Sequence, residues 1–129
     1  MRIKDHFGNV AALKCAVCQQ GATIHHCHGG SMVDWFGAEM SPRWGQKQND
    51  WLVIPLCGKH HYGEDGIDTG MGNIKGVCEW ESHFGLQVYH LIQVDSMLPY
   101  SIWEMAGLPN PTNAYDSHAY RRSLRAAAQ

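Results

Sequence analysis

Three short segments of this 129-residue chain carry cysteine and histidine side chains at spacings that can bind metal ions. They are residues 15–18 (Cys-Ala-Val-Cys), 25–26 (His-His) and 57–61 (Cys-Gly-Lys-His-His). Thiolate and imidazole are usual zinc ligands, and a structural zinc takes four of them in a tetrahedron. Because the segments supply more than four, the sequence predicts one metal that holds the fold and a second site that performs chemistry.

The structural zinc is expected where two pairs of ligands have matched spacing. The Cys-x-x-Cys turn supplies one pair, and residues 57–61 supply the second, three positions apart. The predicted ligands are Cys15, Cys18, Cys57 and His60. A Cys-x-x-Cys turn also fits a redox-active pair, and that alternative stays open. Cys27 and Cys78 have no paired neighbour, and we expect both to be buried as small apolar side chains.

The second site is predicted from the directions in which adjacent side chains point. Adjacent helical residues lie about 100° apart around the axis, so if His60 binds the zinc, His61 faces another side. Asp65 follows four residues later on the face of His61 and offers a carboxylate. Neighbours on a strand point to opposite faces, so His25 and His26 are expected to divide into one metal ligand and one general base that activates water. The alternative is that this histidine-rich strand merely supplies a different ligand set.

Length and composition restrict the class of protein. A chain of 129 residues is expected to form one domain with a modest core that a metal can stabilise. Its five cysteines are an odd number, which does not suit a complete disulfide framework. No N-terminal basic segment precedes an apolar run, and no stretch reaches the ~18 apolar residues needed to cross a bilayer. An intracellular protein with no membrane partner is therefore expected.

The charge balance gives only weak information about partners. The formal net charge is -2, which does not favour non-specific binding of nucleic acid through Lys and Arg alone. A bound divalent ion would add positive charge where a phosphate would lie, so nucleic acid stays a candidate partner. The densest basic stretch, residues 121–125, is interpreted as a solvated tail.

Two short strands and a following helix are expected to position the metal ligands. The strands are predicted at 22–27 and 51–56, and the second is rich in β-branched and aromatic residues. Helices are predicted at 57–65 and 77–84, and a short one follows Leu98-Pro99 and runs to Met105. Loops are expected at 28–49 and 66–76, a lead-in at 1–14, a helix or strand at 86–94, and a tail at 112–129.

The order of these motifs resembles the HNH nucleases, which are also called ββα-metal or His-Me finger enzymes. The likeness covers roughly residues 15–90 and is greater to phage and prophage HNH proteins of the recombination-enhancement type. It rests on the His-His pair followed by Gly29-Gly30, on Asp50–His61 (Asp-Trp-Leu-Val-Ile-Pro-Leu-Cys-Gly-Lys-His-His) and on Glu79–Gly85 (Glu-Trp-Glu-Ser-His-Phe-Gly).

The resemblance implies an α+β fold, with a small zinc-stapled ββα-metal core and long loops at 15–94. Helices added at the C-terminus would form an extension or tail at 95–129. Members of the family commonly place Asn before the helix, where it fixes the loop that carries the base. Here Asn49 and Asp50 precede the second strand, and Asp50 matches the phage-type pattern better.

The resemblance also implies roles for the residues of the second site. His26 would be the general base, and His25 and His61 would bind a catalytic divalent metal. The third ligand would lie one turn further on, where many members have His and this chain has Asp65 beside Glu64. A carboxylate favours a hard ion, so Mg²⁺ or Mn²⁺ is expected, with Zn²⁺ kept as an alternative.

The function implied by the resemblance is metal-dependent hydrolysis of DNA phosphodiester bonds in phage or prophage recombination. The protein would act in the cytoplasm of a bacterial host on duplex or single-stranded DNA, with a recombination or replication protein as a further partner. The alternative is a zinc-stabilised module that binds nucleic acid or a partner protein without cutting.

Overall fold

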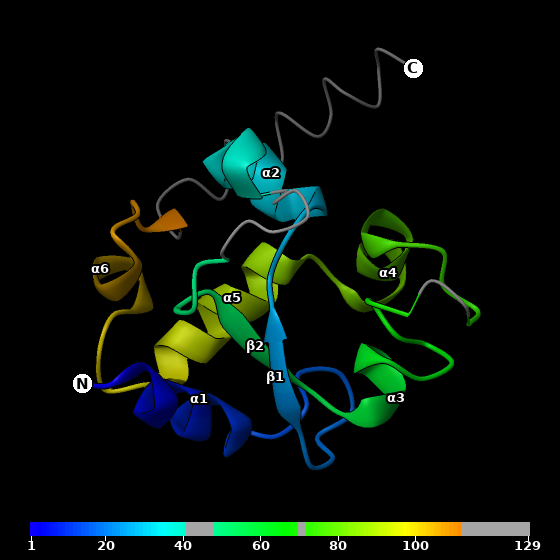
Figure 1. The fold of residues 1–129 in the computed structure, drawn as a ribbon, viewed down its shortest axis with the longest axis horizontal. Coiled ribbons are helices and arrows are strands. Elements are labelled where there is room, and N and C mark those ends of the chain that lie inside the picture. Colours follow the sequence, from blue (N-terminus) through cyan, green and yellow to red (C-terminus); the bar gives the residue numbers. More distant parts are fainter. Residues whose placement is uncertain (41–47, 70–71, 112–129) are drawn as a thin grey trace.

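The computed structural model describes residues 1–40, 48–69 and 72–111, and it combines short helices with one two-stranded antiparallel sheet (Figure 1). In chain order the elements are α1 (Ile3–Ala11), β1 (Thr23–His26), α2 (Gly30–Phe36), η1 (Ala38–Met40), β2 (Val53–Leu56), α3 (Gly58–His61), α4 (Val77–Phe84), α5 (Gln87–Met97) and α6 (Ile102–Ala106). This mixture agrees with the expected α+β class. The predicted tail, with its basic stretch, lies outside the described residues.

The two predicted strands are confirmed with shorter bounds, and they pair at the centre of the fold. His25 lies opposite Ile54, and His26 lies opposite Val53. Both α1 and α5 pack against β2, so all four residues of that strand are buried. This explains why β2 is a continuous apolar run (Val-Ile-Pro-Leu), whereas β1 carries polar side chains and only His25 of its four residues is buried.

The N-terminal segment, expected as a lead-in, contains helix α1. Its apolar residues Ile3, Phe7 and Val10 repeat at helical spacing. Val10 and His6 are fully buried, and His6 Nε2 donates to the carbonyl of Trp51 at 3.1 Å. The helix is therefore part of the core and is fastened to the chain just before β2.

Helices α2 and η1 lie in the region expected as a long loop. Gly29 and Gly30, with φ of 63° and 46°, lead the chain into α2 in a conformation that favours glycine. A Cβ on Gly30 would overlap the carboxylate of Glu81. The backbone N–H of Ser31 donates to Glu81 Oε1 at 2.9 Å, and its hydroxyl donates to Oε2. These contacts fasten α2 to α4.

The helices that follow β2 agree with the sequence more closely. Helix α4 has the predicted bounds, and α6 matches the short helix expected after residue 98. The ambiguous segment 86–94 is helical, as α5, and this helix continues to Met97. It therefore spans the boundary expected between the core and the C-terminal extension. Helix α3 covers only four residues and ends earlier than expected.

The core is filled by aromatic and aliphatic side chains from α4, α5, α6 and the sheet. Trp80, Trp103 and Leu91 are fully buried, and Cys27 is 6% exposed, as predicted. The same prediction for Cys78 is wrong, because Cys78 lies in the first turn of α4 and is exposed.

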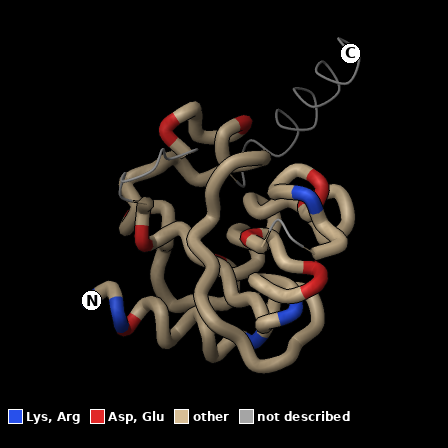
Figure 2. The backbone as a smooth tube through the Cα atoms, turned by 45° about the vertical axis from the view of Figure 1, so that its right-hand side comes forward, with Lys and Arg blue, Asp and Glu red and all other residues tan. Residues whose placement is uncertain are grey.

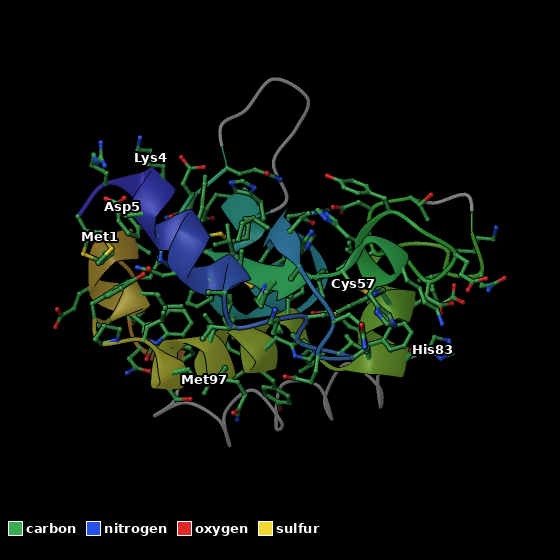
Figure 3. The ribbon with its side chains drawn as sticks, turned by 90° about the horizontal axis from the view of Figure 1, so that it is seen from below. Met1, Lys4, Asp5, Cys57, His83 and Met97 are labelled. Carbon is green, nitrogen blue, oxygen red and sulfur yellow. The ribbon has the colours of Figure 1, made fainter. Side chains whose placement is uncertain are left out.

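The labelled side chains in Figure 3 show where the core ends and where its interior lies. His83 on α4 and Met97 at the end of α5 lie at the periphery, while Cys57 lies in the interior (Figure 3). Within the described residues, no helix combines the length and the apolar character needed to cross a membrane.

Candidate functional site

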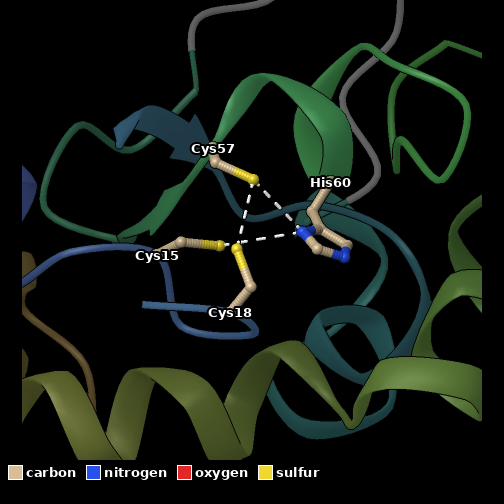
Figure 4. A group of neighbouring side chains, drawn as sticks. All are labelled: Cys15, Cys18, Cys57 and His60. Atoms are coloured by element: carbon tan, nitrogen blue, oxygen red, sulfur yellow. Dashed lines mark hydrogen bonds between the residues drawn. The ribbon is translucent and has the colours of Figure 1, made fainter. Parts of the chain in front are cut away.

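Four cysteine and histidine side chains converge where β2 leads into α3 (Figure 4). They are the predicted ligands Cys15, Cys18, Cys57 and His60. Cys57 Sγ lies 3.5 Å from Cys18 Sγ and 3.2 Å from His60 Nδ1, and all four ligand atoms lie within 4.8 Å of one another. With Zn–S bonds of ~2.3 Å, the edges of a tetrahedral zinc site are about 3.8 Å long. This Cys₃His cluster is therefore compatible with a structural metal such as zinc.

A tight turn and the sheet bring the two halves of this cluster together. The turn that begins at Cys15 is closed by a hydrogen bond from its N–H to Gln20 O at 2.8 Å. The next residue, Ala16, donates its N–H to Pro55 O in β2 at 2.9 Å. This bond fastens the turn beside the strand that ends at Cys57.

Burial and hydrogen bonding set the protonation of these ligands. Burial alone would raise the pKa of the Cys15 thiol, but backbone N–H groups, led by that of Cys57, lower it overall. Burial lowers the pKa of His60. The backbone N–H of Gln20 acts to lower the pKa of Cys18, yet burial and the neighbouring thiols raise it overall. Cys15 and His60 thus favour their metal-binding forms, while Cys18 would release its proton when a metal binds.

A second cluster of imidazoles surrounds the carboxylate of Asp68. His25 Nδ1 and His61 Nε2 lie 2.9 and 3.0 Å from Asp68 Oδ2, and His28 Nε2 lies 2.9 Å from Asp68 Oδ1. His25 is fully buried, and His61 is 3% exposed. The ligand atoms of His25, His28 and Asp68 lie within 4.8 Å of one another, so this group can hold a metal ion. The structure thus brings together the predicted His25 and His61 and adds two residues.

The predicted third ligand, Asp65, lies outside this cluster, and Asp68 takes its place. Because α3 ends at His61, a separation of four residues no longer places Asp65 on the same helical face. Its carboxylate lies 3.5 Å from Lys59 Nζ instead. The chain turns tightly at Gly66, and the N–H of Asp68 then donates to the carbonyl of His61 at 3.1 Å. That bond sets the Asp68 side chain beside the imidazole.

The surrounding imidazoles keep Asp68 ionised. Burial alone would raise the pKa of this carboxyl group, but hydrogen bonds from His25, His28 and His61 hold it well below its usual range. An ionised carboxylate with nitrogen ligands on two sides is a donor set that divalent metal ions use in proteins. The residues present therefore fit a metal.

His26, the predicted general base, points away from its neighbour His25 and pairs with Asp50. His26 Nε2 lies 2.9 Å from Asp50 Oδ1, and about a third of each side chain is exposed. The ring of Phe7 in α1 packs edge-on against the imidazole, with centroids 5.7 Å apart. A carboxylate and an aromatic ring therefore orient His26 while leaving it accessible to water.

Asn49, the other candidate before the second strand, hydrogen-bonds to backbone groups of Trp51 and Ala106. Its Oδ1 accepts a hydrogen bond from Trp51 N at 3.0 Å, and its Nδ2 donates to Ala106 O at 3.3 Å. These bonds hold the segment that carries Asp50.

His26 and the imidazole cluster open into one polar pocket of about 280 Å³. The pocket is lined by Ile24, His26, His28, Gln48, His61, Tyr62 and Asp68. The exposed ring of Tyr62 stacks on His61, with centroids 3.7 Å apart. Water can therefore reach His26 and the imidazole cluster through the same pocket.

Comparisons with protein-family models, curated proteins and solved structures find no match. A function for this chain is therefore argued from the geometry of the site and from the order of its motifs.

The sequence prediction omits two residues at this site, namely Asp68 and Gln87, and it includes His28 only within the alternative ligand set of the histidine-rich strand. His28 follows His25 by three residues, a spacing of metal ligands that was available as a signal. Asp68 and Gln87 carry no comparable local signal, because one is placed by the turn after α3 and the other by the packing of α5 against the sheet.

Proposed function

We propose that the protein hydrolyses phosphodiester bonds of DNA in a metal-dependent reaction of the HNH type. The observation that carries the proposal is the position of His26, paired with Asp50, on the same pocket as the imidazoles around Asp68. Hydrolysis of a phosphodiester needs a base that deprotonates water and a positive charge near the phosphate. In this proposal His26 supplies the base, and a divalent ion bound by the imidazole cluster would supply the charge.

His26 acts as the general base in this proposal. A carboxylate oxygen only accepts hydrogen bonds, so His26 Nε2 carries the hydrogen that faces Asp50. The other ring nitrogen, Nδ1, is then free to take a proton from the attacking water. Asp50 orients the ring and stabilises the imidazolium that forms, and a base positioned in this way contributes a factor of about 10²–10⁴ to the rate.

His25, His61 and Asp68 would hold the divalent cation, with His28 as a fourth ligand. When bound, the cation would neutralise charge on the phosphate and on the departing oxygen. Imidazole ligands suit zinc better than magnesium, which prefers oxygen ligands and retained water. Because His28 adds a further imidazole ligand, we no longer expect the site to prefer magnesium.

The order of the central elements supports the assignment to the HNH class. Strands β1 and β2 followed by α3 have the strand–strand–helix order that the resemblance implies, and the Cys₃His cluster would hold that unit together. DNA as the substrate, and a role in phage or prophage recombination, come from the resemblance and belong to the proposal.

The described part of the chain offers few basic side chains to bind phosphate. In this proposal the bound cation therefore supplies much of the phosphate binding. Lys and Arg there are few and are interspersed with Asp and Glu rather than gathered into one stripe (Figure 2). These basic residues are Arg2, Lys4, Lys14, Lys59 and Lys75. We therefore expect DNA affinity to increase when a divalent ion is present.

Plasmid cleavage by the purified protein, compared across Mg²⁺, Mn²⁺ and Zn²⁺, tests the proposal. His26→Ala is expected to lower the cleavage rate by about 10²–10⁴-fold, with little change in divalent-ion affinity. The matched control is His83→Ala, because His83 is an exposed histidine on α4. That variant should cleave like the unmodified protein.

Two outcomes oppose the proposal. Cleavage that needs no divalent ion, or that survives His26→Ala unchanged, removes the role assigned to this site. DNA binding without cleavage in any of the three metals supports the non-catalytic binding module instead.

A further inference from the structure

The side-chain amide of Gln87 lies between His25 and the backbone of His28. Gln87 is the first residue of α5, and both its side chain and that of His25 are fully buried. Gln87 Oε1 lies 2.9 Å from His25 Nε2 and accepts from His28 N at 3.1 Å. Gln87 Nε2 donates to His28 O at 2.8 Å. The amide thus contacts a proposed metal ligand on the side of the ring opposite the cation site.

The backbone of His28 determines which way this amide faces. A backbone N–H can only donate and a carbonyl can only accept, so Oε1 must face the N–H and Nε2 must face the carbonyl. A flipped amide would place donor against donor and acceptor against acceptor. Because Oε1 only accepts, His25 Nε2 must carry a hydrogen. The neutral ring of His25 then has its lone pair on Nδ1, toward Asp68.

A similar argument gives the opposite tautomer for His61. Thr23 Oγ1 lies 3.2 Å from Leu56 O and 3.2 Å from His61 Nδ1. The carbonyl of Leu56 can only accept, so it takes the hydroxyl hydrogen of Thr23. Thr23 Oγ1 then accepts from His61 Nδ1, and the neutral ring has its lone pair on Nε2, toward Asp68.

We propose that Gln87 is a positioning residue that holds His25 with its ring hydrogen on Nε2. Thr23 is the corresponding residue for His61 and holds the hydrogen on Nδ1. The two remaining ring nitrogens lie 2.9 and 3.0 Å from the same oxygen of Asp68. Without a cation, a hydrogen on each of these nitrogens makes the contact with the carboxylate, and a bound cation would take the place of those hydrogens. This inference rests on the metal site of the proposed function and names the residues that aim its ligands.

A buried carboxylate keeps the Gln87 amide in place. Glu81 accepts the backbone N–H of Gln87 at 2.7 Å and that of Ser31 at 2.9 Å. The hydroxyl oxygen of Ser31 accepts the N–H of Val88 at 3.2 Å. The first turn of α5 is therefore fixed to α2 and α4, and the amide has a defined position beside His25.

Nitrogen-15 NMR of the histidine rings in the full chain tests the tautomers directly. With Zn²⁺ bound, the one ring hydrogen of His25 is expected on Nε2 and that of His61 on Nδ1. These positions are expected because the metal would occupy only the nitrogen that faces Asp68 in each ring. In the Zn²⁺-bound protein, a hydrogen on Nδ1 of His25, or on Nε2 of His61, overturns the proposal.

Variants of Gln87 test whether the tautomer matters for metal binding. Gln87→Leu removes the acceptor and is expected to weaken Mn²⁺ binding by about 10–100-fold, the usual effect of losing a partner of a metal-binding histidine. Gln87→Glu keeps an acceptor oxygen for His25 Nε2 but loses the donor to His28 O, and it is expected to bind Mn²⁺ more tightly than Gln87→Leu. Gln93→Leu, on an exposed position of the same helix, is the matched control and should bind Mn²⁺ like the unmodified protein.

Thr23 provides a second pair of variants at an exposed position, where folding is not at risk. Thr23→Val should weaken Mn²⁺ binding and Thr23→Ser should not. Equal Mn²⁺ affinity of the Val and Ser variants, or of the Leu variant at 87 and its control, contradicts the proposal. If the tautomers and affinities follow expectation but DNA is not cleaved, only the proposed nuclease function fails.

Discussion

The imidazoles of His60 and His61 point into different clusters, although the two residues are adjacent in α3. His60 Nδ1 lies 3.2 Å from Cys57 Sγ, whereas His61 Nε2 lies 3.0 Å from Asp68 Oδ2. Successive residues of a helix are about 100° apart around its axis, so neighbouring side chains diverge. Each cluster therefore has its own ligands and can be disrupted separately.

Substitution of Cys57 by Ser is expected to remove the structural metal. A structural zinc binds with an apparent free energy of about 10–16 kcal/mol in small metal-dependent domains, whereas a domain of this size is stable by only about 5–15 kcal/mol. Loss of one thiolate should therefore abolish the cooperative unfolding transition. Metal analysis together with thermal unfolding checks this prediction.

The exposed Cys78 offers a matched control for that experiment. Cys78→Ser should retain stoichiometric zinc and an unchanged melting temperature. A Cys57→Ser protein that keeps both properties would show that no metal is held by the Cys₃His cluster.

The two aspartates that follow α3 should differ in their effect on the second cluster. Asp68→Asn removes the charge to which three imidazoles point and is expected to weaken Mn²⁺ binding by at least about 100-fold, more than the loss of an outer partner. Asp65→Asn removes only a partly exposed ion pair with Lys59, worth at most about 1 kcal/mol. Titration calorimetry with Mn²⁺ measures both variants, and a larger loss in Asp65→Asn would restore the assignment made from the sequence.

The contrast between these aspartates shows where prediction from sequence stops. The matched Cys and His pairs and the opposite directions of His25 and His26 follow from fixed helical and strand geometry, whereas Asp50 is indicated only by the resemblance to the HNH nucleases. The assignment of the third ligand to Asp65 depended on the length of α3. The end of this helix is set by a turn that hydrogen bonds between backbone groups stabilise. No periodic pattern encodes those contacts.

The sequence prediction also missed helix α1, but for a different reason. Ile3, Phe7 and Val10 do repeat at helical spacing, so its signal was present in the sequence. The segment is short and precedes the metal ligands, and its importance appears only when Phe7 packs on His26. Gln87 had no signal at all, because its role depends on where α5 docks.

Gly66 is expected to tolerate no side chain. A Cβ at this position would lie 2.7 Å from the carbonyl oxygen of His61, so Gly66→Ala must displace the turn that carries Asp68. We expect a loss of about 1–3 kcal/mol in the free energy of unfolding together with weaker Mn²⁺ binding. Gly58→Ala, where a Cβ meets nothing within 4 Å, should change neither quantity in urea unfolding and Mn²⁺ titration.

The stability of the protein should fall as the pH is lowered through the range of histidine titration. Burial lowers the pKa of His6, and its hydrogen bond to the Trp51 carbonyl offsets only part of this effect. The unfolded chain therefore binds more protons than the folded chain below the unfolded pKa of about 6.5. The contribution of His6 is complete above that pH and decreases below it, by at most about 1.4 kcal/mol per pH unit.

Urea unfolding between pH 8 and pH 5, at constant zinc, measures this dependence. His6→Gln should reduce the slope of stability against pH, since it removes one buried titrating group. His83→Gln changes an exposed histidine and should leave the slope as it was. Equal slopes in all three proteins would show that His6 does not contribute.

The shared position of both clusters on α3 has a consequence for how this sequence can change over evolution. The segment Cys57–His61 sets two ligand directions through the rotation of a single turn of helix. Insertion or deletion of one residue between Cys57 and His60 would rotate everything that follows by about 100° and misdirect both imidazoles at once. Homologous chains should therefore vary freely at Gly58 and Lys59 while keeping the length of this segment constant.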